Sequence, residues 1–252
     1  MAQVPAGYMR FLTSGADVVA LGACAEAVRR AVGDRSLYDY AATHPGRRAL
    51  RGRGVAYAVT LPDEETRVVV RHSRHGGLLA PVTGDRFFPP TRAPHELRTA
   101  LQLADAGVPT PEVIAYATYP AGAVFRRSDV ATREVVGGRN LGELLGDGEP
   151  PDQRASVLEA TVVLLGALER AGARHPDLNV GNVLIVGSAD GSHRALVLDV
   201  DRVVFGRPGD PAIGSANVRR LLRSARKLRA QGRITASEDE LTMLATAVGA
   251  RV

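Results

Sequence analysis

The segment HPDLNVGNVLI at 175–185 places several polar side chains directly before an apolar run. Asp177 and Asn182 are five positions apart, and Asp199 and Asp201 end the next apolar segment. A carboxylate can accept a proton from a hydroxyl group, and carboxylate and amide oxygens are suitable ligands for Mg²⁺. A triphosphate and its transition state need such ions to neutralise their negative charge. This combination of residue types therefore fits phosphoryl transfer.

A predicted β-hairpin brings these groups together. The strand NVLIVG at 182–187 is followed by a turn at 188–192 and by the strand RALVLDVD at 194–201. Because a hairpin folds its two ends together, Asn182 and Asp199 are expected to be neighbours despite the gap between them in the sequence.

Two side chains near this pair have simpler interpretations. His175 is expected to hold the loop by hydrogen bonding and not to move protons. Asp201 could contact a second metal ion, pair with Arg202 or stabilise a turn, and the sequence leaves these roles open.

The hydrophobic periodicity predicts an α+β fold with a β-rich N-terminal lobe and a mostly helical C-terminal lobe. In the first lobe, strands are expected at 54–61, 66–73, 108–119 and 122–135, and one main helix at 95–107. In the second lobe, helices are expected at 140–145, 156–172, 215–232 and 238–247.

The two lobes are expected to span 1–136 and 137–252 and to form one domain together. The boundary is placed near the Gly137-Gly138 pair. The first 45 residues are poorly assigned, and within them the sequence predicts a single short helix at 23–32.

Composition limits the possible partners and the compartment. The 252 residues carry a formal net charge of +5, which suits anionic partners such as nucleotides or phosphorylated lipids. Cys24 is the single cysteine, which excludes an internal disulfide and a thiolate zinc site and favours a reducing compartment. Neither a signal-peptide pattern nor an apolar stretch of about 20 residues occurs, so we expect a cytoplasmic protein.

The order His-x-Asp-Leu-x-x-x-Asn, followed by a metal-binding Asp, resembles the catalytic loop of the protein-kinase-like superfamily. Asn179 stands where protein kinases usually carry a basic residue. Asp199-Val200-Asp201 replaces their Asp-Phe-Gly, and no Ala-Pro-Glu follows. These departures favour a compact kinase for a small molecule or a lipid over a regulated protein kinase.

Further motifs are similar to those of the lipopolysaccharide kinases, and most closely to kinases of 3-deoxy-D-manno-octulosonic acid (Kdo). The resemblance runs from about residue 48 to 230. Besides the catalytic loop, it rests on VLDVDR at 197–202, VVVRHSRHGGLL at 68–79, the TR…HELR…AGVPTPE run at 91–112 and ANVRRLLRSARKLR at 216–229. It implies a two-lobed protein-kinase-like fold.

The resemblance also assigns roles to individual residues. It makes Asp177 the catalytic base, and Asn182 and Asp199 the metal ligands. Arg71 would contact the nucleotide from the third strand, with Glu96 as its partner on the helix that follows. Protein kinases use Lys at the strand position, but the planar fork of Arg can also bridge phosphate oxygens and a carboxylate.

The segment RGRGVAY at 51–57 is the candidate for a glycine-rich cover over the phosphates. Gly52 and Gly54 precede a predicted strand there, which is the placement that such a cover needs.

The function that the resemblance implies is ATP- and Mg²⁺-dependent phosphorylation of Kdo, at its 4-hydroxyl, in the inner core of lipid A. The substrate would be an anionic glycolipid, Kdo-lipid A, reached at the cytoplasmic face of the inner membrane, and no nucleic acid is expected as a partner. A basic set on the last long helix is either a solvated face or a contact with anionic lipid: Arg219, Arg220, Arg223, Arg226, Lys227 and Arg229.

Other functions stay open at this point. The acceptor could be a core heptose, an aminoglycoside-like molecule or a protein hydroxyl. The chain could also be a pseudokinase that binds ATP without transferring phosphate, although Asp177, Asn182 and Asp199 together argue against this.

Overall fold

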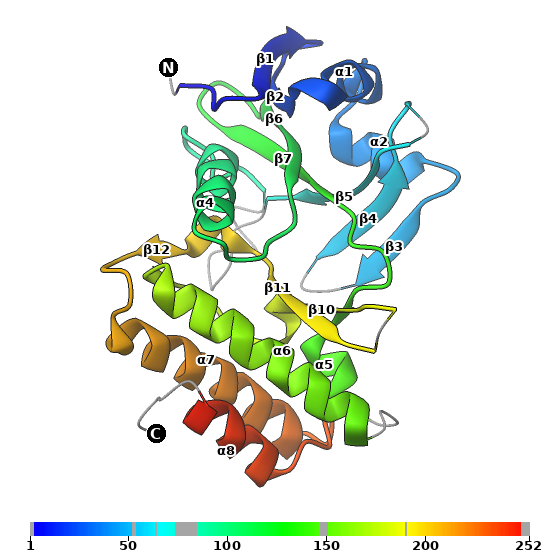
Figure 1. The fold of residues 1–252 in the computed structure, drawn as a ribbon. Coiled ribbons are helices and arrows are strands. Elements are labelled where there is room, and N and C mark those ends of the chain that lie inside the picture. Colours follow the sequence, from blue (N-terminus) through cyan, green and yellow to red (C-terminus); the bar gives the residue numbers. More distant parts are fainter. Residues whose placement is uncertain are drawn as a thin grey trace. The chain divides into compact units, whose positions relative to one another are not determined.

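The computed structural model describes residues 3–51, 54–63, 65–73, 85–146, 151–189 and 191–247 (Figure 1). They fall into two compact units, the first made of Met1–Ala100 and Glu112–Glu134, the second of Leu101–Pro111 and Val135–Val252. An antiparallel sheet dominates the first unit and helices dominate the second, which confirms the predicted α+β class. The lobe limits of 1–136 and 137–252 stay predictions.

A seven-stranded antiparallel sheet forms the core of the N-terminal unit, in the order β1-β2-β6-β7-β5-β4-β3. Its inward positions are apolar, and Val68 and Val70 on β5 are fully buried at the two-residue spacing of a strand. The strands are β1 (Tyr8–Thr13), β2 (Ala16–Leu21), β3 (Arg48–Arg51), β4 (Val55–Thr60), β5 (Arg67–His72), β6 (Val113–Pro120) and β7 (Arg126–Arg133).

Within the described residues, three α-helices accompany this sheet along the chain: α1 (Ala25–Val32), α2 (Leu37–Thr43) and α4 (Ala93–Asp105). The first two pack on the sheet, α1 beside β1 and β2, and α2 beside β4 and β5 (Figure 1). The predicted helix at 23–32 is confirmed as α1. The hairpin of β1 and β2 and the helix α2 were missed, although the Ser14-Gly15 turn, with positive φ at both residues, is a typical hairpin signal.

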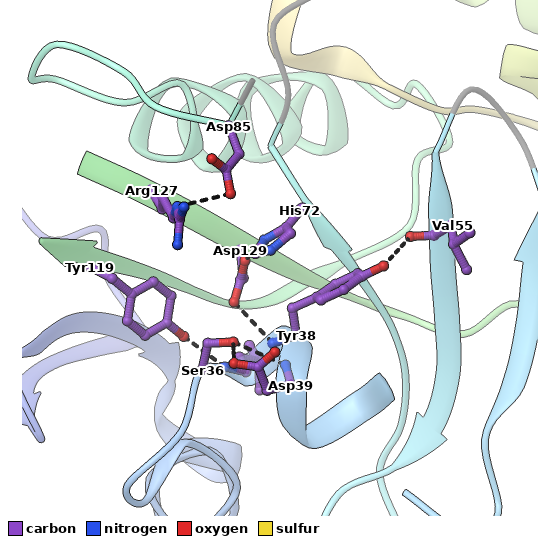
Figure 2. Close-up of polar contacts among 10 residues, drawn as sticks. Ser36, Tyr38, Asp39, Val55, His72, Asp85, Tyr119, Arg127 and Asp129 are labelled. Atoms are coloured by element: carbon purple, nitrogen blue, oxygen red, sulfur yellow. Dashed lines mark hydrogen bonds and ion pairs between the residues drawn. The ribbon is translucent and has the colours of Figure 1, made fainter. Parts of the chain in front are cut away.

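A buried polar network fastens the start of α2 to three strands (Figure 2). The carboxylate of Asp129 on β7 is fully buried, accepts the Tyr38 N–H at 2.9 Å and pairs with His72 of β5. The hydroxyl of Tyr119 on β6 accepts the Leu37 N–H at 2.7 Å. The Tyr38 ring stacks on His72 with centroids 4.2 Å apart. The first amides of α2, which have no partner within a helix, are thereby satisfied.

The described part of the C-terminal unit contains four α-helices with short strands between them. The β10–β11 hairpin continues to β8, and β9 pairs with β12. The elements are β8 (Arg139–Asn140), α5 (Leu141–Leu144), α6 (Pro151–Arg170), β9 (Ala173–Arg174), β10 (Val183–Gly187), β11 (His193–Val197), β12 (Val204–Phe205), α7 (Pro211–Ala230) and α8 (Glu238–Ala247).

The two long helices, α6 and α7, pack side by side (Figure 1). Leu164, Leu165 and Leu168 of α6 and Leu221 and Leu222 of α7 are buried in this unit. Within the described ranges, no helix combines the length and the apolar character that crossing a membrane requires.

The start of α7 is fixed by its own sequence. Asp210 precedes it, and the carboxylate accepts the Ala212 N–H at 2.9 Å. Pro211 occupies the first helical position, where a missing N–H costs nothing. These two residues define where α7 begins.

Replacing Asp129 with Ala is expected to lower the free energy of unfolding by about 3 kcal/mol, because the half-buried Tyr38 N–H loses its acceptor and the half-buried His72 ring loses its partner. Urea unfolding followed by circular dichroism measures the change. Asp17→Ala is the matched control, since it removes an exposed pair with Arg10 that is worth less than about 1 kcal/mol. Equal losses in the two variants would contradict the assignment.

Candidate active site

The β10–β11 hairpin brings Asn182 and Asp199 to the same end, as predicted. Val183 pairs with Val197 in the last rung of the ladder. One residue beyond it on each side, the Leu198 N–H donates to the Asn182 carbonyl at 2.9 Å. Asp199 follows directly. The predicted strand at 194–201 ends earlier than expected, at Val197.

Asp199 breaks the strand because its backbone is left-handed, with φ 60° and ψ 47°. This conformation is disfavoured for residues other than Gly, and Asp is among the few types that tolerate it. Such backbone is concentrated at functional sites, where the surrounding structure holds it in place. Here it turns the chain from β11 into a short 3₁₀ helix, Val200–Arg202, which contains Asp201.

The catalytic loop is held by its own asparagines. The Asn179 amide nitrogen donates to the Asp177 carbonyl at 2.8 Å, and the Asn179 amide oxygen accepts the Gly181 N–H at 2.9 Å. The Asn182 amide nitrogen donates to the same Asp177 carbonyl at 3.0 Å. With its nitrogen engaged, Asn182 presents its Oδ1 atom as the one that can bind a cation.

His175 holds the loop through both nitrogen atoms of its ring. Its Nε2 lies 3.0 Å from the Leu198 carbonyl, and its Nδ1 accepts the Asp177 N–H at 3.2 Å. These two bonds fix the tautomer with the proton on Nε2. His175 is 1% exposed, and burial lowers the pKa of its ring. The contacts are those of the holding residue that the sequence predicts.

Helix α7 supports the loop with a stripe of polar side chains that sequence reasoning missed. Asn217 donates to the Ala173 carbonyl and accepts the His175 N–H, both at 2.9 Å. Three and seven residues further along α7, Arg220 and Ser224 also contact the loop. Positions i, i+3 and i+7 share one face of a helix, so this spacing is the signal that could have found them.

The last two contacts differ in kind. The Ser224 hydroxyl accepts the Val180 N–H at 3.4 Å, a long bond to the backbone. An Arg220 nitrogen, Nη2, lies 2.7 Å from Oδ1 of Asp177 and thus contacts the predicted base itself. Arg220, expected to belong to a solvated or lipid-facing set, instead extends from α7 to the catalytic loop.

Asn182 and Asp199 carry oxygen atoms that are suitable Mg²⁺ ligands, but two residues do not supply all the ligands that the ion needs. Among the residues that the structure describes, no group of three or more His, Cys, Asp or Glu side chains is placed to hold a metal ion. Mg²⁺ is often bound by one or two protein oxygens together with substrate phosphates and waters. The residues present therefore fit an ion shared with a nucleotide and not a resident protein-only site.

In the N-terminal unit, the structure brings Arg71 and Glu96 together as predicted. An Arg71 nitrogen lies 2.5 Å from the Glu96 carboxylate, which comes from the first turn of α4 and is 3% exposed. A buried carboxylate requires a partner of this kind, so the pair fixes the direction of the Arg71 side chain. Its role toward a nucleotide stays a prediction.

The predicted glycine-rich cover is described in part. Gly54 is an exposed residue in the bend before β4. Gly52 lies outside the described residues. The role of both glycines toward phosphate stays a prediction.

Comparisons with known proteins agree with this architecture. A solved structure of WaaP in complex with acyl carrier protein shares the fold, with a TM-score of 0.56 and 18% identity, covering 89% of this chain and 87% of that chain. The protein-kinase-like fold class predicted from the sequence is thereby confirmed. Residues 47–245 match the lipopolysaccharide kinase (Kdo/WaaP) family, and the chain belongs to that family.

Curated relatives indicate which proteins of this family the chain is similar to. A 3-deoxy-D-manno-octulosonic acid kinase of Vibrio parahaemolyticus is 27% identical over 201 residues, which are 78% of this chain and 79% of that protein. A protein of the same name from Stenotrophomonas maltophilia is 32% identical over 187 residues, covering 71% and 69%. Membership of this family and these relatives support the conclusion that the chain is a lipopolysaccharide kinase, which is a phosphotransferase.

Stability is expected to fall with pH below about 6.5, the ordinary pKa of histidine, because the folded pKa of His175 is lower. In that range the unfolded chain binds the proton first, so acid favours unfolding, and the contribution is fully present above pH 6.5. Urea unfolding between about pH 5 and 8, compared with His175→Gln, isolates it. The prediction fails if both proteins show the same pH slope.

Proposed function

We propose that this protein transfers the γ-phosphoryl group of ATP to a hydroxyl of Kdo, the 4-hydroxyl, in the inner core of a lipid A precursor. The observation that carries the proposal is the Asp177 loop: the base is buried, and its carbonyl accepts both Asn179 and Asn182 amides. Family membership supports the substrate class, and the Kdo kinase names of the relatives support the sugar.

In the proposed reaction, the Asp177 carboxylate accepts the proton of the sugar hydroxyl as its oxygen attacks the γ-phosphorus. A new phosphorus–oxygen bond forms, the bond to the β-phosphate oxygen breaks, and ADP leaves with that electron pair. The proton on Asp177 then passes to solvent. Positioning and charge neutralisation supply most of the rate in such transfers, which explains why the loop is so firmly hydrogen-bonded.

Asn182 and Asp199 would hold Mg²⁺ through oxygen atoms. When bound, the ion neutralises charge on the phosphate oxygens. As the resemblance implies, Arg71 would contribute positive charge toward the nucleotide, and its ion pair with Glu96 fixes the direction of its side chain.

The acceptor is proposed to be reached at the cytoplasmic face of the inner membrane. The exposed positive charges of α7 support this contact with the membrane. Fewer basic residues are available for it than the sequence suggests, because some of them form ion pairs within the protein. Arg226 and Arg229 bind Glu238 at 2.7 and 2.6 Å, and Arg220 binds Asp177. Arg219, Arg223 and Lys227 are exposed on the same helix and would attract anionic lipid.

Asp177→Asn should lower kcat by about 10²- to 10⁴-fold, since it removes the proton acceptor while keeping the shape. Purified protein is incubated with ATP, Mg²⁺ and Kdo-lipid A, and mass spectrometry counts the phosphorylated glycolipid. Asp239→Ala, an exposed carboxylate on α8, is the control. An acceptor panel with a heptose, an aminoglycoside and a peptide tests the substrate. Absence of phosphorylated Kdo-lipid A with the parent protein would refute the proposed function.

Mg²⁺ should bind much more tightly in the presence of a non-hydrolysable ATP analogue than in its absence, because the two protein ligands need phosphate oxygens beside them. Titration calorimetry with and without the analogue measures this. Asn182→Ala and Asp199→Ala should each raise the Mg²⁺ concentration required, and Asp239→Ala should not. Equally tight binding without nucleotide would contradict a shared site.

A further inference from the structure

Arg220 combines an engaged and an unengaged nitrogen beside the predicted base. Its Nη2 lies 2.7 Å from Oδ1 of Asp177, while its side chain is 38% exposed. Its Nε is buried and has no hydrogen-bond partner within the described part of the chain. Because the Nε atom is closed to solvent, the exposed part of the guanidinium group is the part that a substrate can reach.

Arg220 is not needed to hold the loop in place, because other residues of α7 already hold it. Asn217 makes two buried hydrogen bonds to the backbone at Ala173 and His175. These contacts involve neutral groups with both ends satisfied. Arg220 instead brings a full positive charge to a carboxylate, and more than a third of its side chain stays exposed.

The catalytic loop itself lacks the cation that protein kinases usually place there. Asn179 occupies that position, and both ends of its amide are used within the loop, at Asp177 and Gly181. Arg220, 43 residues after Asp177, delivers positive charge from α7 to the Asp177 carboxylate. The charge absent from the loop sequence is thus supplied by tertiary structure.

We propose that Arg220 binds an oxyanion next to the hydroxyl that reacts at Asp177. A substrate hydroxyl bonded to Asp177 lies within one hydrogen-bond length of a group that Arg220 also touches, so an oxyanion attached near that hydroxyl falls within reach of the fork. This inference rests on the proposed role of Asp177 as base.

Two substrate groups share the required chemistry. One is the transferring phosphoryl group, whose charge is spread over three oxygens in the transition state. The other is the carboxylate of the acidic sugar. Both are planar or near-planar arrays of oxygens that an arginine fork can bind with two parallel bonds, which a lysine ammonium cannot do.

The experiment compares Arg220→Gln and Arg220→Lys with the parent protein. It measures kcat, the KM of Kdo-lipid A, and the slow hydrolysis of ATP without acceptor. If Arg220 binds the phosphoryl group, Arg220→Gln lowers kcat and ATP hydrolysis together by about 10²- to 10³-fold, with little change in the acceptor KM. If it binds the carboxylate, the acceptor KM rises by about tenfold or more and hydrolysis is unchanged.

Arg220→Lys is expected to retain an intermediate rate in either case, since it keeps the charge and loses the fork. Arg207→Ala, an exposed arginine before α7, is the matched control and should behave like the parent. Thermal unfolding of each variant accounts for loss of folded protein. If kcat, KM and hydrolysis per folded molecule all stay within about twofold of the parent, Arg220 is structural and the proposal is overturned.

The same measurements separate this inference from the proposed function. If Kdo-lipid A is phosphorylated equally by the parent and by Arg220→Gln, the function stands and the role of Arg220 fails. If the parent phosphorylates no Kdo-lipid A but hydrolyses ATP in a manner that depends on Arg220, the acceptor is wrong and the oxyanion contact stands.

Discussion

The buried amide of Asn217 is the contact on which the geometry of the C-terminal unit depends. Its oxygen and nitrogen both bond to backbone more than 40 residues earlier, at His175 and Ala173. Because neither group can reach water, losing either bond would leave a buried polar atom unpaired. The loop and α7 therefore behave as one piece. The contacts of Asn217 thus help to place Asp177, Asn182 and the hairpin that carries Asp199.

The N-terminal unit uses a comparable device with different chemistry. There a buried carboxylate, Asp129, joins the start of α2 to the sheet through His72 and a backbone amide. In both units a buried polar group with several satisfied partners fixes one helix to its neighbours. Such groups specify a single arrangement more strictly than apolar contacts, which tolerate sliding. Arg71 lies on β5 beside His72, and Asp177 lies in the loop that Asn217 holds, so both are carried by segments fixed in this way.

The sequence predicted the parts of the site that depend on local order. Hairpin geometry follows from a turn between two apolar runs, so the meeting of Asn182 with the residues beside Asp199 was predictable. The pairing of Arg71 with Glu96 came from a resemblance in motif order, which carries three-dimensional information that spacing alone does not.

Contacts between distant segments were beyond that reasoning. The pattern of α7 shows which face is apolar, but not that its polar edge meets a loop 43 residues earlier at Asp177. A run of arginines looks uniform in sequence, and the structure divides it into residues bound to Asp177, residues bound to Glu238 and residues left exposed. The pairing of His72 with Asp129, 57 residues apart, has no sequence signal of its own.

The hairpin of β1 and β2 completes the sheet of the N-terminal unit, although it lies outside the segment that matches the family. The family match begins at residue 47, yet β2 pairs with β6 along Asp17–Ala20, and α1 and α2 bury the adjoining face. A chain cut at the family boundary would leave β6 as a bare edge with unpaired amides and carbonyls, the kind of edge that recruits strands from other molecules. The segment that matches the family model is thus shorter than the segment needed to complete this sheet.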